Sequence, residues 1–262
     1  MVKKLVLYDK IYNIPSENKK QELIKKYLTY LKEITKGFHN TYITIKKLRE
    51  FDIRFELIIS GPEETFIVNL LKKEIGSIFE FNEIQLNKTY KGMMIDVGKV
   101  GFGIFVDCAI VNPKSDVLIN LHTLREQLCE GRTKSLKEII QTYDFIDNFP
   151  IFIKVVSIDI EKRQILAEID KITLRLFKKI LDEDLEAVFV NGETKGQVKK
   201  VIIKKGHLRD IVSIERFGFL ESLIIFKEGT SAPGIIAEIG NSLKNCKMSA
   251  IRPGRIRKML QN

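Results

Sequence analysis

The chain has 262 residues, of which 44% are hydrophobic, and its formal net charge is +10 at pH 7. This length is sufficient for two or three small domains, and the hydrophobic fraction argues against disorder over most of the chain. No run of about 18 apolar residues occurs, which excludes a membrane-spanning helix and gives no reason to expect a membrane partner.

The cysteines and the first residues bear on the compartment. Cys108, Cys129 and Cys246 are unevenly spaced and form no Cys-x-x-Cys pair. This scatter favours reduced thiols over a disulfide framework or a zinc site. Residues 1–5 lead directly into a strand-like segment and have no signal-peptide pattern. We therefore expect a cytoplasmic protein.

Residues 1–86 alternate between strand and helix patterns. Strands are expected at 4–10, 41–47, 52–58 and 78–86. One helix follows Ser16, a typical N-cap residue, and a second helix starts after Gly61. The resulting β-α-β-β-α-β order predicts a ferredoxin-like domain within an α+β protein. This order implies no activity by itself.

Residues 87–170 predict a small barrel. Strands are expected at 91–97, 102–110, 116–121, 150–158 and 163–169, and one polar helix is expected at about 123–142. Five strands with a helix between the third and the fourth is the order of an OB-fold barrel.

Residues 171–262 predict a third, basic α/β domain. A helix is expected at about 172–182, followed by a hairpin of strands 186–190 and 198–204, strands at 210–216 and 220–227, a helix from Ser231, a strand at 247–251 and a short helix from Gly254. The net charge is +4 over residues 1–88, −2 over 89–190 and +8 over 191–262. The third domain is therefore the expected contact for a polyanion.

Four fragments in the middle of the chain resemble the S1 RNA-binding domain. Gly92 precedes the F-G-x-F-V block at 102–106, residues 117–124 resemble the third strand, and residues 151–168 resemble the closing hairpin. The match covers about residues 87–170 and implies an OB-fold that binds RNA. Asn120 stands where the family has a His, and His122 where it has a Ser. As a whole, the chain resembles an uncharacterised archaeal family with a central S1-like domain, which implies no activity.

The expected RNA-binding residues lie on the barrel and in the third domain. Phe102 and His122 are candidates for stacking on unpaired bases. In a regular strand Phe105 faces away from Phe102, so both rings point outward only if the strand is irregular. The alternative interpretation is that both rings belong to the core. Candidate phosphate contacts, which are equally compatible with solvated side chains, are Lys91, Lys99, Lys154, Arg163, Lys199, Lys200, Lys204, Lys205 and Arg209.

The sequence contains no catalytic motif and no metal-ligand spacing, since its three histidines lie far apart. We therefore expect neither an enzyme nor a cofactor. The predicted function is non-catalytic binding of single-stranded or ribosomal RNA, associated with the ribosome, translation or RNA processing. The alternative is an adaptor that docks on a protein complex through the barrel, which the negative charge of residues 89–190 favours.

Overall fold

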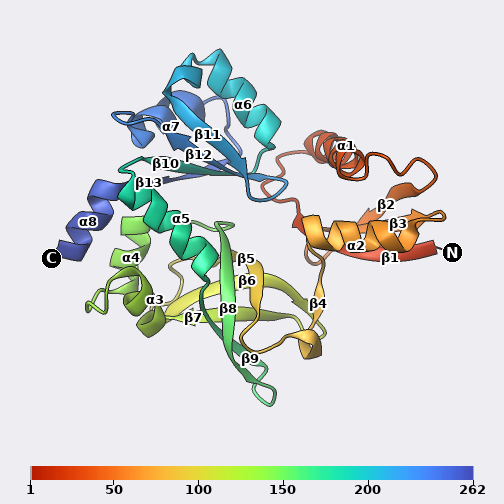
Figure 1. The fold of residues 1–262 in the computed structure, drawn as a ribbon, viewed down its shortest axis with the longest axis horizontal. Coiled ribbons are helices and arrows are strands. Elements are labelled where there is room, and N and C mark those ends of the chain that lie inside the picture. Colours follow the sequence, from red (N-terminus) through yellow and green to blue (C-terminus); the bar gives the residue numbers. More distant parts are fainter. Residues whose placement is uncertain (1, 262) are drawn as a thin grey trace. The chain divides into compact units, whose positions relative to one another are not determined.

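The protein is described here by a computed structural model, which covers residues 2–261. The fold is α+β and separates into two compact units, Met1–Phe79 and Glu80–Asn262. Each unit is described by itself, and Figure 1 gives the element labels.

The N-terminal unit is a three-stranded antiparallel sheet covered by two helices. Its elements are β1 (Val2–Lys10), α1 (Glu17–Ile34), β2 (Tyr42–Leu48), β3 (Arg54–Ser60) and α2 (Glu64–Glu74). The strand order is β1-β3-β2, which leaves β2 at an edge of the sheet. Tyr27 of α1 stacks on Phe55 of β3, with ring centroids 3.7 Å apart. Ser16 caps α1 by accepting a hydrogen bond from the Lys19 amide, as expected.

The prediction of a fourth strand over residues 78–86 was wrong in length. Strand β4 contains only Phe79–Glu80 and is followed by the 3₁₀ helix η1 (Phe81–Glu83). The Glu80 amide donates to Glu83 Oε2 at 2.8 Å, and this capping box closes a helical turn where a strand was expected. Next to β1, an isolated bridge joins Leu7 and Ser77.

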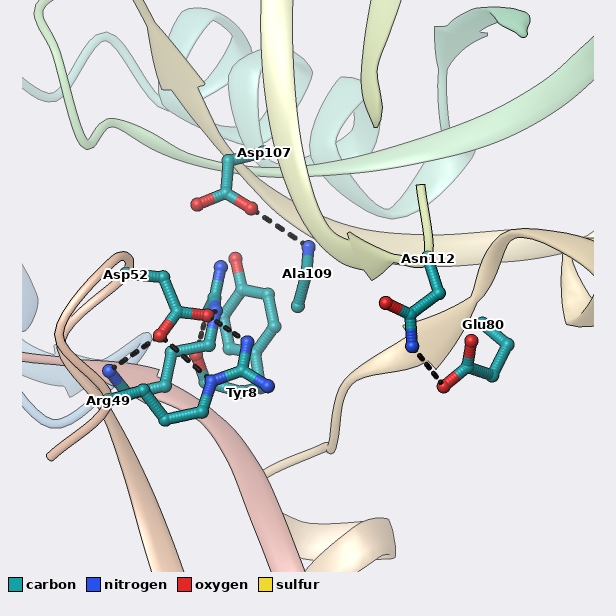
Figure 2. A network of polar contacts seen from close by, with 8 residues as sticks. Tyr8, Arg49, Asp52, Glu80, Asp107, Ala109 and Asn112 are labelled. Carbon is teal, nitrogen blue, oxygen red and sulfur yellow. Dashed lines mark hydrogen bonds and ion pairs between the residues drawn. The ribbon is translucent and has the colours of Figure 1, made fainter. Parts of the chain in front are cut away.

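A buried charge network fixes the turn between β2 and β3. Asp52 accepts a hydrogen bond from Arg49 Nε at 3.0 Å (Figure 2) and another from the Arg54 amide at 3.2 Å. Arg54 is only 2% exposed, and its guanidinium donates to the Tyr8 carbonyl of β1. The guanidinium also pairs with Asp52, since Arg54 Nε lies 3.3 Å from Asp52 Oδ2, and a buried charge of this kind requires such partners.

The second unit contains the expected closed barrel of five strands. They are β5 (Thr89–Ile95), β6 (Gly103–Val111), β7 (Ser115–Asn120), β8 (Pro150–Asp159) and β9 (Gln164–Ile169). Strand β6 pairs with β5 and β7, β8 pairs with β5 and β9, and a parallel β7–β9 pairing closes the barrel. Alternate residues such as Ile104, Val106, Val117 and Ile119 are buried inside it.

Two short helices replace the single helix expected at 123–142. They are α3 (Leu121–Leu128) and α4 (Leu136–Tyr143). The break falls at Gly131, whose φ of +78° is incompatible with an α-helix. Ser135 then starts α4, because its hydroxyl accepts from the Glu138 amide and the Glu138 carboxylate accepts from the Ser135 amide.

The C-terminal part is a four-stranded antiparallel sheet with helices. Its elements are α5 (Lys171–Asp182), β10 (Ala187–Asn191), α6 (Lys195–Lys204), η2 (His207–Asp210), β11 (Ile211–Arg216), β12 (Glu221–Phe226), α7 (Ala232–Gly240), β13 (Lys247–Ile251) and α8 (Pro253–Gln261). The strand order is β11-β12-β10-β13. Helices α6 and α7 cover one face of this sheet (Figure 1).

The strand expected at 198–204 was wrong, because this segment is helix α6. Its buried residues Val198, Val201 and Ile202 follow helical spacing and pack on the sheet. Gly206, at φ +85°, ends the helix and donates its amide to the Ile203 carbonyl at 3.0 Å. The lysines expected on a hairpin therefore project from a helix.

The barrel and the C-terminal sheet share one aromatic core. Phe149, the residue before β8, lies 4.2 Å from Phe189 of β10, measured between ring centroids. Phe177 of α5 contacts Phe149 and Phe145 from a second side. This shared core explains why residues 80–262 form one compact unit.

Candidate nucleic-acid interface

Phe102 and Phe105 come together on the outer surface of the barrel. Phe102 is 55% exposed, Phe105 is half-buried, and their rings meet edge to face with centroids 6.0 Å apart. Phe102 precedes Gly103, the first residue of β6, so the alternation of a regular strand does not apply to it. Its carbonyl accepts from the Leu121 amide at 2.8 Å, which anchors the backbone while the ring stays outside.

Gly103 holds this corner because no side chain fits there. A Cβ atom would collide with the Ile119 carbonyl and would lie 2.8 Å from Leu118 Cδ1. Strands β6 and β7 can therefore approach closely only with glycine at this position. The F-G-x-F-V block has a structural reason for its glycine.

Two aliphatic residues flank the rings. Ile95 of β5 and Leu118 of β7 both lie opposite Phe105 in the strand register, and both are half-buried. We call Phe102, Phe105, Ile95 and Leu118 the barrel patch. Sequence reasoning missed the two aliphatic members, although their alternation with buried Met94, Val117 and Ile119 indicates that they face outward.

His122 is exposed in the first turn of α3, directly after Leu121. Its neighbour Asn120, which replaces the usual His of the S1 domain, has a structural task. The Asn120 side chain caps α3 by accepting from the Thr123 amide at 2.8 Å.

The four basic residues of the barrel that were predicted to contact phosphates do not lie together on one surface. Lys99, in the loop after β5, donates to Asp96 at 2.6 Å, and this hydrogen bond raises the pKa of Lys99. Lys154 lies opposite Thr89, where β5 begins, and pairs with Glu168 at 3.1 Å. Lys91 lies on the β5–β8 surface opposite Phe152.

Arg163 is exposed in the β8–β9 turn, beyond Lys154. The register thus spreads these cations along the barrel, and Lys99 and Lys154 already have carboxylate partners. The barrel patch has no cluster of cations built around it from the residues that the sequence singled out.

The lysines in the second half of α6 and at its C-cap are exposed to solvent. Lys199, Lys200, Lys204 and Lys205 are exposed, and we call them the α6 lysine face. Lys200 and Lys204 are four residues apart and lie on the same side of the helix. None of the four has a carboxylate within 4.0 Å among residues 2–261, and the same holds for exposed Arg209 on η2.

His207 lies beside this surface and is held by two carboxylates. Its Nδ1 is 2.9 Å from Asp210 Oδ2, and its Nε2 is 2.9 Å from Glu238 Oε2 of α7. The hydrogen bond to Asp210, and after it that to Glu238, raises the pKa of the imidazole above its usual 6.5. Both ring nitrogens carry protons when the two carboxylates are ionised, so the bridge favours the imidazolium.

No group of three or more His, Cys, Asp and Glu side chains that could hold a metal ion occurs within the described part of the chain. Within the same part, no helix combines the length and the apolar character needed to cross a membrane.

Two family models match the second unit, one over the barrel and one over the C-terminal sheet. Residues 84–180 match the DUF2110 central domain, and residues 185–251 match the DUF2110 C-terminal domain. Both matches are to DUF2110. The central match contains the whole barrel, and the C-terminal match contains the four-stranded sheet with α6 and α7. No curated protein matches the chain.

Several solved structures are similar to parts of this chain. The uncharacterized protein MJ1198 from Methanocaldococcus jannaschii is 17% identical, covering 34% of this chain and 96% of its own, with a TM-score of 0.24. GSP13 from Bacillus subtilis is 18% identical, covering 33% and 56%, with a TM-score of 0.25. The alpha subunit of aIF2 from Pyrococcus abyssi is 10% identical, covering 64% and 97%, with a TM-score of 0.26.

Proposed function

We propose that this chain is a non-catalytic RNA-binding protein. In this proposal the barrel patch holds unpaired bases, and the α6 lysine face contacts phosphates. The barrel acts as an S1-like OB-fold, with Phe102 and Phe105 in the positions that the F-G-x-F-V resemblance implies.

The single observation that carries the proposal is the exposed, edge-to-face pair of Phe102 and Phe105 at the beginning of β6. Exposed apolar side chains that lie together, unlike single ones, mark binding surfaces. A base stacked on such a ring contributes about 1–3 kcal/mol, with little sequence preference. His122, exposed on the neighbouring α3, offers a further polar or stacking contact.

Affinity for the phosphate backbone comes from the C-terminal part in this proposal. Residues 89–190 have a net charge of −2, and residues 191–262 have +8. Since backbone contacts dominate non-specific affinity, a net acidic barrel needs cations from elsewhere in the chain. The unpaired lysines of α6 and Arg209 meet this need.

The test is the substitution Phe102→Ala, with Ile160→Ala as the control. Ile160 is 77% exposed at the β8–β9 turn, outside the barrel patch. We expect Phe102→Ala to weaken binding of a fluorescent oligouridine about 5- to 150-fold, which corresponds to about 1–3 kcal/mol. The control should bind like the wild type.

Stability distinguishes a stacking ring from a core ring. An exposed ring costs little when truncated, whereas truncation of a buried Phe costs about 3–5 kcal/mol. A loss of that size in Phe102→Ala, together with unchanged RNA binding, contradicts the proposal.

A protein adaptor is the second candidate function, and the composition of the barrel patch favours it. Ile95 and Leu118 add aliphatic surface to the two rings, and apolar patches of this kind also dock other proteins. Leu118→Ser separates the two functions, because the loss of an aliphatic contact weakens protein docking more than base stacking.

The setting we infer is the ribosome, translation or RNA processing in the cytoplasm. Crosslinking in native cells, followed by sequencing of the bound RNA and identification of the bound proteins, tests it. Recovery of proteins without RNA favours the adaptor. We also infer that the N-terminal unit is ferredoxin-like, with its fourth strand reduced to the Leu7–Ser77 bridge.

A further inference from the structure

The N-terminal unit contains a hollow lined by cationic and aromatic side chains. It has a volume of about 420 Å³ and lies between the end of α1, the segment 37–41 and the edge strand β2. A pocket of about 300–1,000 Å³ is the usual size for a small organic ligand. The hollow is therefore large enough for one nucleotide.

The charged side chains that line the hollow are all of one sign. Lys32 and Lys36 line it, together with His39, and no Asp or Glu is among its lining residues. Lys32 and Lys36 have no carboxylate within 4.0 Å in the described range 2–261. The lining residue Thr41 donates a hydrogen bond from its Oγ1 to Glu63 Oε2 at 3.4 Å.

The C-terminus of α1 reduces this positive potential only in part. The partial negative charge at a helix end is about half an elementary charge, whereas two lysines contribute two positive charges. The hollow is therefore complementary to an anion.

Two aromatic rings accompany these cations. Tyr42, the first residue of β2, is 70% exposed, and Phe38 is half-buried against Phe66 of α2, with ring centroids 5.0 Å apart. Phe38 is thus held in place by packing, and Tyr42 offers a ring to solvent. An accessible ring beside unpaired lysines is the arrangement that binds a base and its phosphate together.

We propose that this hollow binds one unpaired nucleotide of a single-stranded RNA, with the base on Tyr42 and the phosphate on Lys32 and Lys36. The inference rests on RNA being the ligand of this chain and adds a second contact site in the N-terminal unit. It assigns a role to a part of the chain that lies outside both DUF2110 matches.

The experiment uses the full chain with labelled Tyr and Phe rings, observed by NMR. Adenosine 5′-monophosphate is titrated first, then inorganic phosphate and adenosine separately, and finally oligouridine. We expect the nucleotide and oligouridine to shift the ring signals of Tyr42 and Phe38. Inorganic phosphate and adenosine should each bind at least tenfold more weakly than the nucleotide.

The variants are Lys32→Gln with Lys36→Gln, and Tyr42→Leu. Their matched controls are Lys25→Gln, an exposed lysine on α1 outside the hollow, and Phe51→Leu, an exposed ring beneath the Arg49 guanidinium. We expect the double lysine variant and Tyr42→Leu to weaken nucleotide binding about tenfold or more, and the controls to leave it unchanged.

Three outcomes overturn the inference. If oligouridine shifts the Phe102 signals but not those of Tyr42, the hollow fails and the barrel proposal stands. If phosphate binds as well as the nucleotide, the hollow is an anion site without base recognition. If oligouridine shifts neither the Phe102 signals nor those of Tyr42 and Phe38, the proposed function fails. If in that case the mononucleotide still shifts the Tyr42 signals, RNA is excluded as the ligand of the hollow.

Discussion

His207 stands out among single residues because one imidazole joins two elements through two carboxylates. Asp210 belongs to the 3₁₀ helix η2, and Glu238 to α7. Opposite charges and hydrogen bonds to the protonated ring favour the imidazolium in the folded state. The expected consequence is a local stability that depends on pH near neutrality.

The direction follows from the raised pKa of His207. Its contribution to stability is fully present below the unfolded pKa of about 6.5 and is lost as the pH rises through the higher folded pKa. Replacement of His207 by Gln should therefore lower the melting temperature more at pH 6 than at pH 9. Equal losses at both pH values, measured by thermal unfolding, would mean that the imidazole acts only by packing.

Gly103 offers a sharper test of local packing. In Gly103→Ala the new methyl group meets the Ile119 carbonyl across the β6–β7 pairing, and overpacking of this kind costs about 1–3 kcal/mol. Gly101→Ala is the matched control, because a Cβ there has no atom within 4 Å. Urea unfolding should separate the two variants, and equal midpoints would contradict the close approach.

The rings of Phe102 and Phe105 illustrate what a residue pattern leaves open. The F-G-x-F-V block predicts both positions, but strand alternation assigns them to opposite faces. The observed edge-to-face pair depends on the strand beginning at Gly103, one residue after Phe102. Only the backbone path into the strand, set by pairing with β7, decides that both rings lie outside.

At the scale of elements, α6 is the largest departure from expectation. The segment Val198–Lys205 contains four β-branched residues, a composition that favours a strand. Its apolar residues at 198, 201 and 202 nevertheless form one helical face, and they pack against the sheet formed by β10 and β12. Tertiary packing outweighs β propensity here, because a helix buries all three on one side.

The helix changes the expected effect of neutralising the lysines. Gln at positions 199, 200, 204 and 205 keeps helix propensity and should leave stability nearly unchanged. On one side of α6 only Lys200 and Lys204 share a stripe, so we expect about two lost phosphate contacts. The log-log salt slope of RNA binding should fall by about 0.7 per contact.

Salt titrations of the wild type and of the quadruple variant against one oligouridine measure this change. The double variant Lys200→Gln with Lys204→Gln should reproduce most of it, and Lys137→Gln on α4 serves as an exposed control outside the α6 lysine face. Parallel lines for all variants would remove α6 from the RNA interface and favour the adaptor.

At the scale of the whole molecule, residues 80–262 should behave as one cooperative unit. Phe149, Phe177 and Phe189 connect the barrel, α5 and the C-terminal sheet through ring contacts. A fragment of residues 80–262 should therefore unfold in urea in a single transition, and Phe177→Ala should lower its stability by about 3–5 kcal/mol. Two separate transitions, one for the barrel and one for the sheet, would contradict a shared core.

The sequence alone determined the α+β class, the five strands of the barrel with helical residues between the third and fourth, and the basic character of the last 72 residues. These features follow from local periodicity and composition, which each segment carries by itself. Phe102, Phe105 and the lysines of α6 were also identified from the sequence.

Tertiary structure alone decided the β7–β9 pairing, the outward pair of Phe102 and Phe105 and the helical state of residues 195–204. It also brought Lys32, Lys36 and Tyr42 around one hollow, although nothing in their spacing indicates a site. The physical reason is common to all of these. Each depends on contacts between segments distant in the chain, whose packing energies are comparable to or larger than the local preferences that a sequence pattern expresses.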